Sequence, residues 1–107
     1  MIFRDQGCTF SGPLPAALGA MPNLWRIRVS ENHFTGTVPA EWSKLAPTLN
    51  QLEFDRNYLS GNLSVLADLK LMAVAVHSNV GLCGMVPASV RYASGYNPAG
   101  TRLGQPC

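Results

Sequence analysis

The sequence has few charged residues and no long run of one charge. Charged side chains make up 13% of the 107 residues, and the net charge of +2 comes from eight lysines and arginines against six aspartates and glutamates scattered along the chain. Binding to a phosphate backbone requires a dense row of cationic side chains. The sequence therefore does not indicate a nucleic-acid-binding protein.

Long apolar runs are also absent. The longest candidate, residues 63–76, is interrupted by Asp68 and Lys70, whereas a membrane-spanning helix needs about 18 or more apolar residues in succession. The first residues, MIFRDQGC, lack the apolar segment of about 7–15 residues that a secretory signal contains. We expect no membrane span within these residues, and the chain as it stands shows no export signal.

Metal-binding patterns are missing as well. The three cysteines, Cys8, Cys83 and Cys107, include no CxxC pair and have no closely spaced histidine, as a structural zinc site would require. Neither zinc nor a cofactor is indicated. An odd number of cysteines leaves at least one of them unpaired within the chain.

The sequence does contain a repeat. Residues 24–32, 49–57 and 71–79 share the pattern LxxLxLxxN, with apolar residues at its first, fourth and sixth positions and asparagine at its end. The asparagines are Asn32, Asn57 and Asn79, at intervals of 25 and 22 residues. This pattern is the signature of the leucine-rich repeat, in which each repeat forms one coil of a solenoid.

A second block follows each asparagine. It reads FTGTVP at 34–39, LSGNLS at 59–64 and LCGMVP at 82–87, and a fourth copy, FSGPLP, stands at 10–15. The fourth copy puts Cys8 where the other repeats have asparagine, which the repeat pattern permits. The chain therefore begins inside a coil, and residues 1–7 form a degraded, irregular or truncated first strand with Phe3 and Asp5 at its inward positions.

These repeats predict an α/β solenoid, a right-handed leucine-rich repeat coil that forms one domain over residues 1–107. Alternation of apolar residues at 26–30, 51–55 and 73–77 predicts short strands, which successive coils align into a parallel β-sheet on the concave face. Segments starting at Pro15, Pro39 and Ser64 predict 3₁₀ or short helices on the convex side. We expect a partial coil at 1–23, coils at 24–48, 49–70 and 71–90, and a C-terminal cap tail at 91–107.

The three asparagines have a structural role in this interpretation. Turning the chain after each strand leaves backbone groups unsatisfied in the interior, and an asparagine amide offers two donors and an acceptor. We expect Asn32, Asn57 and Asn79 to form a ladder that links the coils. Trp42 is expected in the core, whereas Trp25, which flanks a strand, either packs between coils or serves as an exposed anchor for a ligand.

The combination of LxxLxLxxN with x[FL][ST]GxxP resembles the plant-specific subfamily of leucine-rich repeats over about residues 8–90. The resemblance implies a second short strand at 13–14, 37–38 and 62–63; Ser64 departs from the pattern, which has proline there. The end of the chain, from SNVGLCGMVP to Cys107, is similar to the terminal coil and cysteine-bearing cap of green-plant and green-algal members. In such a cap a bridge between Cys83 and Cys107 would tie the tail to the last coil, and Cys8 would be a buried thiol or the partner of an upstream cysteine.

This resemblance also implies a function. Members of the family are typically extracellular receptor ectodomains, receptor-like proteins or cell-wall proteins, and they bind peptides, glycans or partner proteins on the concave or lateral face. We expect a noncatalytic module for a protein or peptide ligand, outside the cell or at its surface. The alternative is an intracellular scaffold, cytoplasmic or cytoskeletal, for example in the cilium axoneme of a flagellated alga.

The sequence gives signals for both compartments. The missing signal segment favours the intracellular scaffold, whereas the cysteine-bearing cap and the glycosylation sequon Asn62-Leu63-Ser64 favour export. The missing signal segment and the signs of export are compatible if Met1 is not the natural start and further coils precede it.

Variable positions of the three strands form columns on the concave face. Adjacent strands lie about 4.8 Å apart, so Arg28 can pair with Glu53, and Asp55 with His77. The ligand-binding face that we predict consists of variable positions on or beside these strands: Trp25, Arg26, Arg28, Ser30, Gln51, Glu53, Asp55, Arg56 and His77.

One column contains the residue types of a hydrolytic triad, Ser30, Asp55 and His77. Catalysis needs histidine between the nucleophile and the acid, but aspartate stands in the middle here. A metal site built from Glu53, Asp55 and His77 would have no second shell to orient its ligands on an open sheet. We therefore expect surface ion pairs, and neither a metal site nor enzyme activity.

Overall fold

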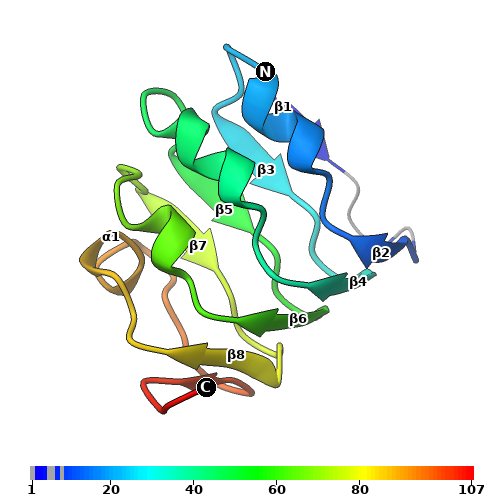
Figure 1. Cartoon of the computed structure of the whole chain (residues 1–107), viewed down its shortest axis with the longest axis vertical. Helices are drawn as coiled ribbons and strands as arrows, with labels where there is room; N and C mark the ends of the chain where they lie inside the picture. The colour runs from blue at the N-terminus through cyan, green and yellow to red at the C-terminus, as the bar shows by residue number, and fades with distance from the viewer. Residues whose placement is uncertain (1, 5–6, 8) are drawn as a thin grey trace.

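The computed structural model of the chain describes residues 2–4, 7 and 9–107, and it is a solenoid of stacked coils (Figure 1). Each coil contributes one strand to the concave sheet, whose order is β1-β3-β5-β7 and whose strands are all parallel. These strands are β1 (Ile2–Arg4), β3 (Arg26–Arg28), β5 (Gln51–Glu53) and β7 (Ala73–Ala75). The predicted parallel sheet of a leucine-rich repeat coil is confirmed.

The concave sheet pairs equivalent residues of successive repeats. Ile27 lies opposite Leu52, and Leu52 lies opposite Val74, so the apolar positions of the repeat stack directly on one another. The first strand follows the same register, with Phe3 opposite Ile27. Residues 2–4 therefore form a strand in register with the next coil, and an irregular strand does not describe these three residues. A degraded or truncated first strand stays a prediction, and Asp5 lies outside the described residues.

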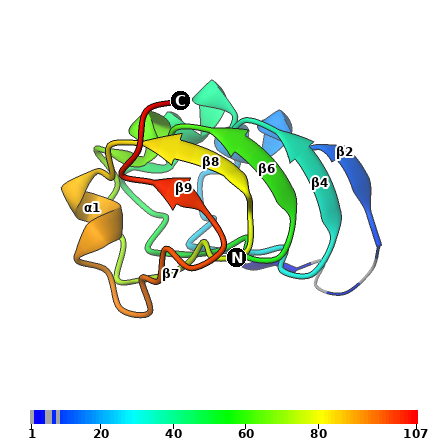
Figure 2. The ribbon, with the colours of Figure 1, turned by 90° about the horizontal axis from the view of Figure 1, so that it is seen from below.

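In each coil the strand of the concave sheet is followed by a second strand, and these second strands form a second sheet. Its order is β2-β4-β6-β8-β9, and Figure 2 shows these strands side by side. They are β2 (Ser11–Pro13), β4 (His33–Gly36), β6 (Tyr58–Gly61), β8 (Gly81–Gly84) and β9 (Arg102–Leu103).

The second strands lie earlier in each repeat than the resemblance implies. Strands were expected at 37–38 and 62–63, but β4 and β6 end at Gly36 and Gly61. Both glycines have a positive φ, of 79° and 77°, a backbone conformation that only glycine adopts without strain. The chain bends at these glycines. Two residues after each bend, the side chains of Val38 and Leu63 lie in the core, 3% and 0% exposed.

The second sheet is staggered, whereas the concave sheet is not. Gly36 pairs with Leu59, which precedes the equivalent Gly61 by two positions, and Gly61 pairs with Leu82, which precedes Gly84 by two positions. A shift of two residues corresponds to roughly 6.6 Å along a strand. The two sheets therefore rotate each coil against the one before it.

Short helices form the convex side, as predicted. They are the 3₁₀ helices η1 (Ala16–Ala20), η2 (Ala40–Leu45) and η3 (Ser64–Leu66), followed by α1 (Ala88–Arg91). Trp42 of η2 is fully buried, which confirms its predicted place in the core, and its Nε1–H donates to the carbonyl of Pro15 in the previous coil at 3.0 Å. The indole thus fills the core and satisfies its one polar group at the same time.

The asparagine ladder is present in all three repeats. Asn57 accepts a hydrogen bond from the amide of Phe34 in the preceding coil at 3.1 Å, and its Nδ2 donates to the carbonyls of Val29, Phe54 and Asp55 at 3.0–3.1 Å. Asn79 repeats this pattern toward Leu59 and Phe54 one coil further on. The position of Cys8, the first member of this column, lies outside the described residues.

The residue before each ladder asparagine has a left-handed backbone. Glu31, Arg56 and Ser78 have φ of 58–60°, and Gly7 takes the same place in the first coil. Left-handed backbone costs a non-glycine residue roughly 1–2 kcal/mol. In return the amides of Glu31 and Arg56 point at the next coil and donate to the carbonyls of Asp55 and His77 at 3.1 and 3.0 Å.

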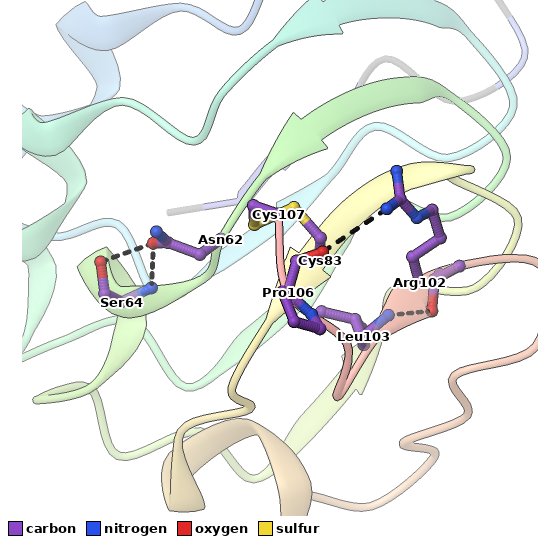
Figure 3. Close-up of a disulfide and its surroundings, with 8 residues drawn as sticks. Asn62, Ser64, Cys83, Arg102, Leu103, Pro106 and Cys107 are labelled. Carbon is purple, nitrogen blue, oxygen red and sulfur yellow. Dashed lines mark hydrogen bonds between the residues drawn. A yellow bond between two sulfur atoms is a disulfide. The ribbon is translucent and has the colours of Figure 1, made fainter.

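The C-terminal cap, residues 88–107, covers the last coil. Val90 of α1 is fully buried, Ser94 pairs with Ala73 at the edge of the concave sheet, and β9 adds a strand to the second sheet beside β8. The disulfide Cys83–Cys107, with Cα atoms 5.1 Å apart, ties the end of the cap to β8 (Figure 3). Both sheet edges at this end are therefore paired rather than open, as the solenoid requires.

Replacing Asn57 with alanine tests the ladder. The variant leaves the Phe34 amide and three carbonyls without this partner, and each buried group left unpaired costs about 1–3 kcal/mol. We expect urea denaturation to show a loss of unfolding free energy in that range or above it. The matched control is Asn97→Ala, because Asn97 is exposed and its loss should cost about 0.5 kcal/mol or less. Equal stability of the two variants would contradict the structural role of the ladder.

Candidate functional site on the concave face

The concave sheet presents two columns of outward-facing side chains. Arg26 lies opposite Gln51, and Gln51 opposite Ala73; Arg28 lies opposite Glu53, and Glu53 opposite Ala75. These are the columns that the sequence predicts. The first strand extends each of them by one residue, Ile2 and Arg4, which the sequence did not single out because the first repeat departs from the pattern upstream of Cys8.

Glu53 is shared by two arginines. Nη2 of Arg26 lies 3.2 and 3.4 Å from its two carboxylate oxygens, and Nε of Arg28 lies 3.4 Å from one of them. The predicted Arg28–Glu53 pair is confirmed, and the Arg26–Glu53 pair is an addition. Arg4, exposed and next to Arg28 in the same column, brings a third guanidinium to this part of the sheet.

We call Arg4, Arg26 and Arg28 the arginine cluster. Arg26 and Arg28 share the carboxylate of Glu53, and Arg4 adds a third positive charge two strands away in the same column, so the cluster keeps a net positive charge. Nε of Arg26 is buried and has no hydrogen-bond partner among the described residues. That buried nitrogen is out of a ligand's reach, but an arginine has five N–H donors, and the exposed Arg4 and partly exposed Arg28 can offer theirs to an acceptor from outside the chain.

Asp55 is the centre of a second, more buried group. Ser30 Oγ donates to Asp55 Oδ1 at 2.5 Å, while Nε2 of His77 lies 3.5 Å and Nε of Arg56 4.0 Å from Oδ2. The predicted Asp55–His77 pair is confirmed. Ser30 and Asp55 are only 5% and 7% exposed, so this group joins three coils and offers little free surface.

This order of contacts does not correspond to a hydrolytic triad. The serine hydroxyl donates to the aspartate, and the histidine lies on the other side of that aspartate. A triad requires the histidine to accept the proton of the serine. In the described part of the chain, there is also no group of three or more histidine, cysteine, aspartate or glutamate side chains that could hold a metal ion.

The remaining predicted residues lie at the margins of the face. Trp25 is 37% exposed and Gln51 half-buried. Arg56 is exposed and pairs with Glu31 at 2.6 Å. Trp25 therefore offers part of its ring to solvent, although its backbone carbonyl is tied to the next coil by the amides of Asn50 and Gln51.

Exposed aromatic side chains also occur outside the predicted set. Phe10 is 47% and Tyr58 61% exposed, and the rings of His33 and Tyr58 meet edge to face at 5.7 Å. A sequence signal exists for part of this lateral group: His33, Tyr58 and Val80 each directly follow a ladder asparagine. That position turns away from the core, so a large side chain there is exposed rather than packed.

Coils with a parallel concave sheet, a ladder of buried asparagines and a capped end define a leucine-rich repeat protein. No protein-family model matches the chain. Receptor-like protein 35 of Arabidopsis thaliana is 32% identical over 81 residues, which cover 76% of this chain and 8% of that protein. The chain is thus a plant-type leucine-rich repeat protein, and it spans less than a tenth of this relative.

Solved structures agree with this assignment. A TDR receptor matches with a TM-score of 0.78 at 31% identity over 94% of this chain and 18% of its own. PEPR1-AtPEP1 matches with a TM-score of 0.71 at 26% identity, over 96% of this chain and 14% of its own. The BIR2 ectodomain from Arabidopsis thaliana matches with a TM-score of 0.69 at 28% identity, over 90% of this chain and 53% of its own. Within the described ranges, no helix is long and apolar enough to cross a membrane.

A double-mutant cycle on Ser30 and Asp55 tests whether the buried group holds the coils together. Asp55→Ala removes the acceptor of the buried Ser30 hydroxyl, so we expect it to destabilise more than Ser30→Ala. The double variant should lose less unfolding free energy than the sum of the losses of the two single variants, with a coupling energy of about 0.5–3 kcal/mol. Urea denaturation of the four proteins measures this coupling. Additive effects would mean that the two side chains contribute independently.

Proposed function

We propose that this chain is a noncatalytic binding module of an extracellular receptor-like protein, and that its concave face binds a peptide or protein ligand. The observation that supports the proposal is the arginine cluster, in which Arg26 and Arg28 share the single carboxylate of Glu53 and remain partly exposed beside Arg4. The similarity to receptor-like protein 35, to the TDR receptor and to PEPR1-AtPEP1 supports it.

The chemistry of the cluster indicates what part of a ligand it takes. Guanidinium groups bind carboxylates through paired N–H donors, and Arg26 and Arg28 are held in place by Glu53 on a rigid sheet. An acidic side chain or a terminal carboxylate of the ligand therefore fits above Arg4, Arg26 and Arg28. Trp25, beside the cluster and partly exposed, adds apolar surface of the kind that often dominates binding energy.

Selection from a phage-displayed library of random peptides tests this function. We expect the immobilised chain to enrich peptides with aspartate, glutamate or a free carboxyl terminus. Arg28→Ala should weaken their binding by about tenfold or more, because removal of a paired charge costs at least about 1.4 kcal/mol. The control is Lys44→Ala, which removes the same charge from the convex side. Selected peptides that bind the Arg28 variant as well as the original chain would contradict the proposal.

The compartment is part of the same proposal. Disulfides persist in oxidising compartments and are rare in the cytosol, so the Cys83–Cys107 bridge favours the extracellular interpretation over the intracellular scaffold. Asn62 of the sequon is exposed, and its Oδ1 accepts hydrogen bonds from the amide and the hydroxyl of Ser64 at 3.1 and 2.7 Å (Figure 3). The glycosylation predicted there is sterically possible, because the side chain lies at the surface.

The mass of the native polypeptide after alkylation of its free thiols distinguishes the extracellular interpretation from the intracellular one. We expect Cys83 and Cys107 to be protected from alkylation, and a peptide containing Asn62 to carry a glycan when the chain passes through the secretory route. Ser64→Ala is the control, because it removes the sequon and leaves Asn62 in place. A native chain whose cysteines are all alkylated and whose Asn62 is unmodified would support the intracellular scaffold instead.

A further inference from the structure

The C-terminal cap contains a cleft that the concave face does not include. Its volume is about 390 Å³, and its walls come from the loop after β8, from α1 and from the strand β9. The lining residues are mostly apolar: Met85, Val86, Arg91, Tyr96, Pro98, Leu103 and Gly104. This volume lies within the range of about 300–1,000 Å³ that is usual for ligand sites.

Large apolar side chains surround the cleft and remain exposed. Met85 is 89% and the neighbouring Tyr92 79% exposed. Single exposed apolar residues are common on protein surfaces and need no explanation. Here they accompany a hollow with apolar walls, which is a combination typical of a protein-binding surface.

The charge in the wall of the cleft comes from an arginine, Arg91. No aspartate or glutamate follows Asp68 in the sequence, whereas Lys70, Arg91 and Arg102 do. The guanidinium of Arg91, a lining residue, lies over the ring of Tyr92 with its carbon 5.2 Å from the ring centre. Stacking of this kind orients the cation without neutralising its charge. A partner that enters the cleft therefore meets positive charge on the cap and no carboxylate side chain of residues 69–107.

One wall of the cleft, the segment from β9 to the end of the chain, is tied to β8. The amide of Gly104 donates to the carbonyl of Gly84 at 2.8 Å, and the amide of Gly84 donates to Gln105 at 2.6 Å. The disulfide Cys83–Cys107 closes the same segment. A site that is already ordered loses little conformational entropy on binding, which favours the complex.

We propose that the cleft on the cap is a second docking site, separate from the concave face, which takes an apolar side chain from an acidic segment of a partner protein. The apolar walls accept the side chain, and Arg91 and Arg102 of the cap attract the flanking carboxylates. A nucleic acid does not fit, because the two dispersed arginines of the cap do not form a phosphate track. A flat lipid surface leaves the hollow unfilled.

Titration of the whole chain with three hexapeptides that have blocked ends tests this site. Binding is monitored by the NMR chemical shifts of the backbone amides. EDLFDE carries the apolar and acidic groups, KSLFSK reverses the charge, and EDSSDE removes the apolar side chains. We expect EDLFDE to shift amides of residues 85–104, and the other two peptides to shift these same amides with at least about tenfold lower affinity. Equal affinity of KSLFSK or EDSSDE at residues 85–104, no shift of these amides by EDLFDE, or EDLFDE shifts confined to β3 and β5 would each overturn the proposal.

Substitutions at exposed positions locate the site without disturbing the fold. Met85→Asp and Arg91→Glu should each weaken EDLFDE binding by about tenfold or more. The matched controls, Met72→Asp and Lys44→Glu, change exposed side chains outside the cleft and should leave binding unchanged. Arg28→Glu should leave the EDLFDE-induced shifts of residues 85–104 unchanged while it removes any shifts in β3 and β5, which separates this site from the concave face. Phosphatidylserine vesicles that bind the chain in a Met85-dependent manner, in the absence of peptide binding, would identify a lipid surface instead and overturn the proposal.

Discussion

Each coil of this chain depends on hydrogen bonds that its neighbour supplies. The asparagine amides accept from one coil and donate within the next, as Asn57 does with Phe34 and Phe54. The side chain of Asn57 reaches back to the preceding coil, whereas the left-handed residues before the asparagines donate their own amides to the following coil. A single coil could not satisfy these groups, and buried backbone groups that lack partners are costly. The stack is therefore the smallest stable unit, and the surfaces that it exposes are consequences of that stacking.

The repeat pattern predicted most of the fold because repeated stacking imposes the same requirements on each coil. Apolar positions such as Ile27, Leu52 and Val74 recur at one spacing, so the register of the concave sheet and the Arg28–Glu53 pair follow from counting. The second strands did not follow in the same way. Their ends are set by the bends at Gly36 and Gly61, which the pattern marks but does not align with a strand. For the first strand the pattern placed Phe3 correctly but left three alternatives open, because Ile2–Arg4 lies next to residues that depart from the repeat.

The two surfaces proposed here differ in how the sequence encodes them. The arginine cluster lies at variable positions of the repeat, so the repeat pattern itself identifies it as surface. The cleft of the cap lies in a segment without periodicity, where Met85, Tyr96 and Leu103 come together only through the path of the tail. Exposure, ion pairing and the position of a hollow are tertiary properties. For that reason the burial of Ser30 and Asp55 and the existence of the cleft required the folded chain.

The stagger of the second sheet has a geometric consequence for any long ligand. The concave sheet stacks its residues in straight columns, whereas the second sheet advances by two residues at every coil. The solenoid axis is therefore a spiral, and the inner surface turns as it progresses. A straight, stiff ligand can remain in contact with only a few successive coils before the surface rotates away from it. A ligand that follows more coils must bend with the spiral, and it passes gradually from the sheet face to the flank of the solenoid.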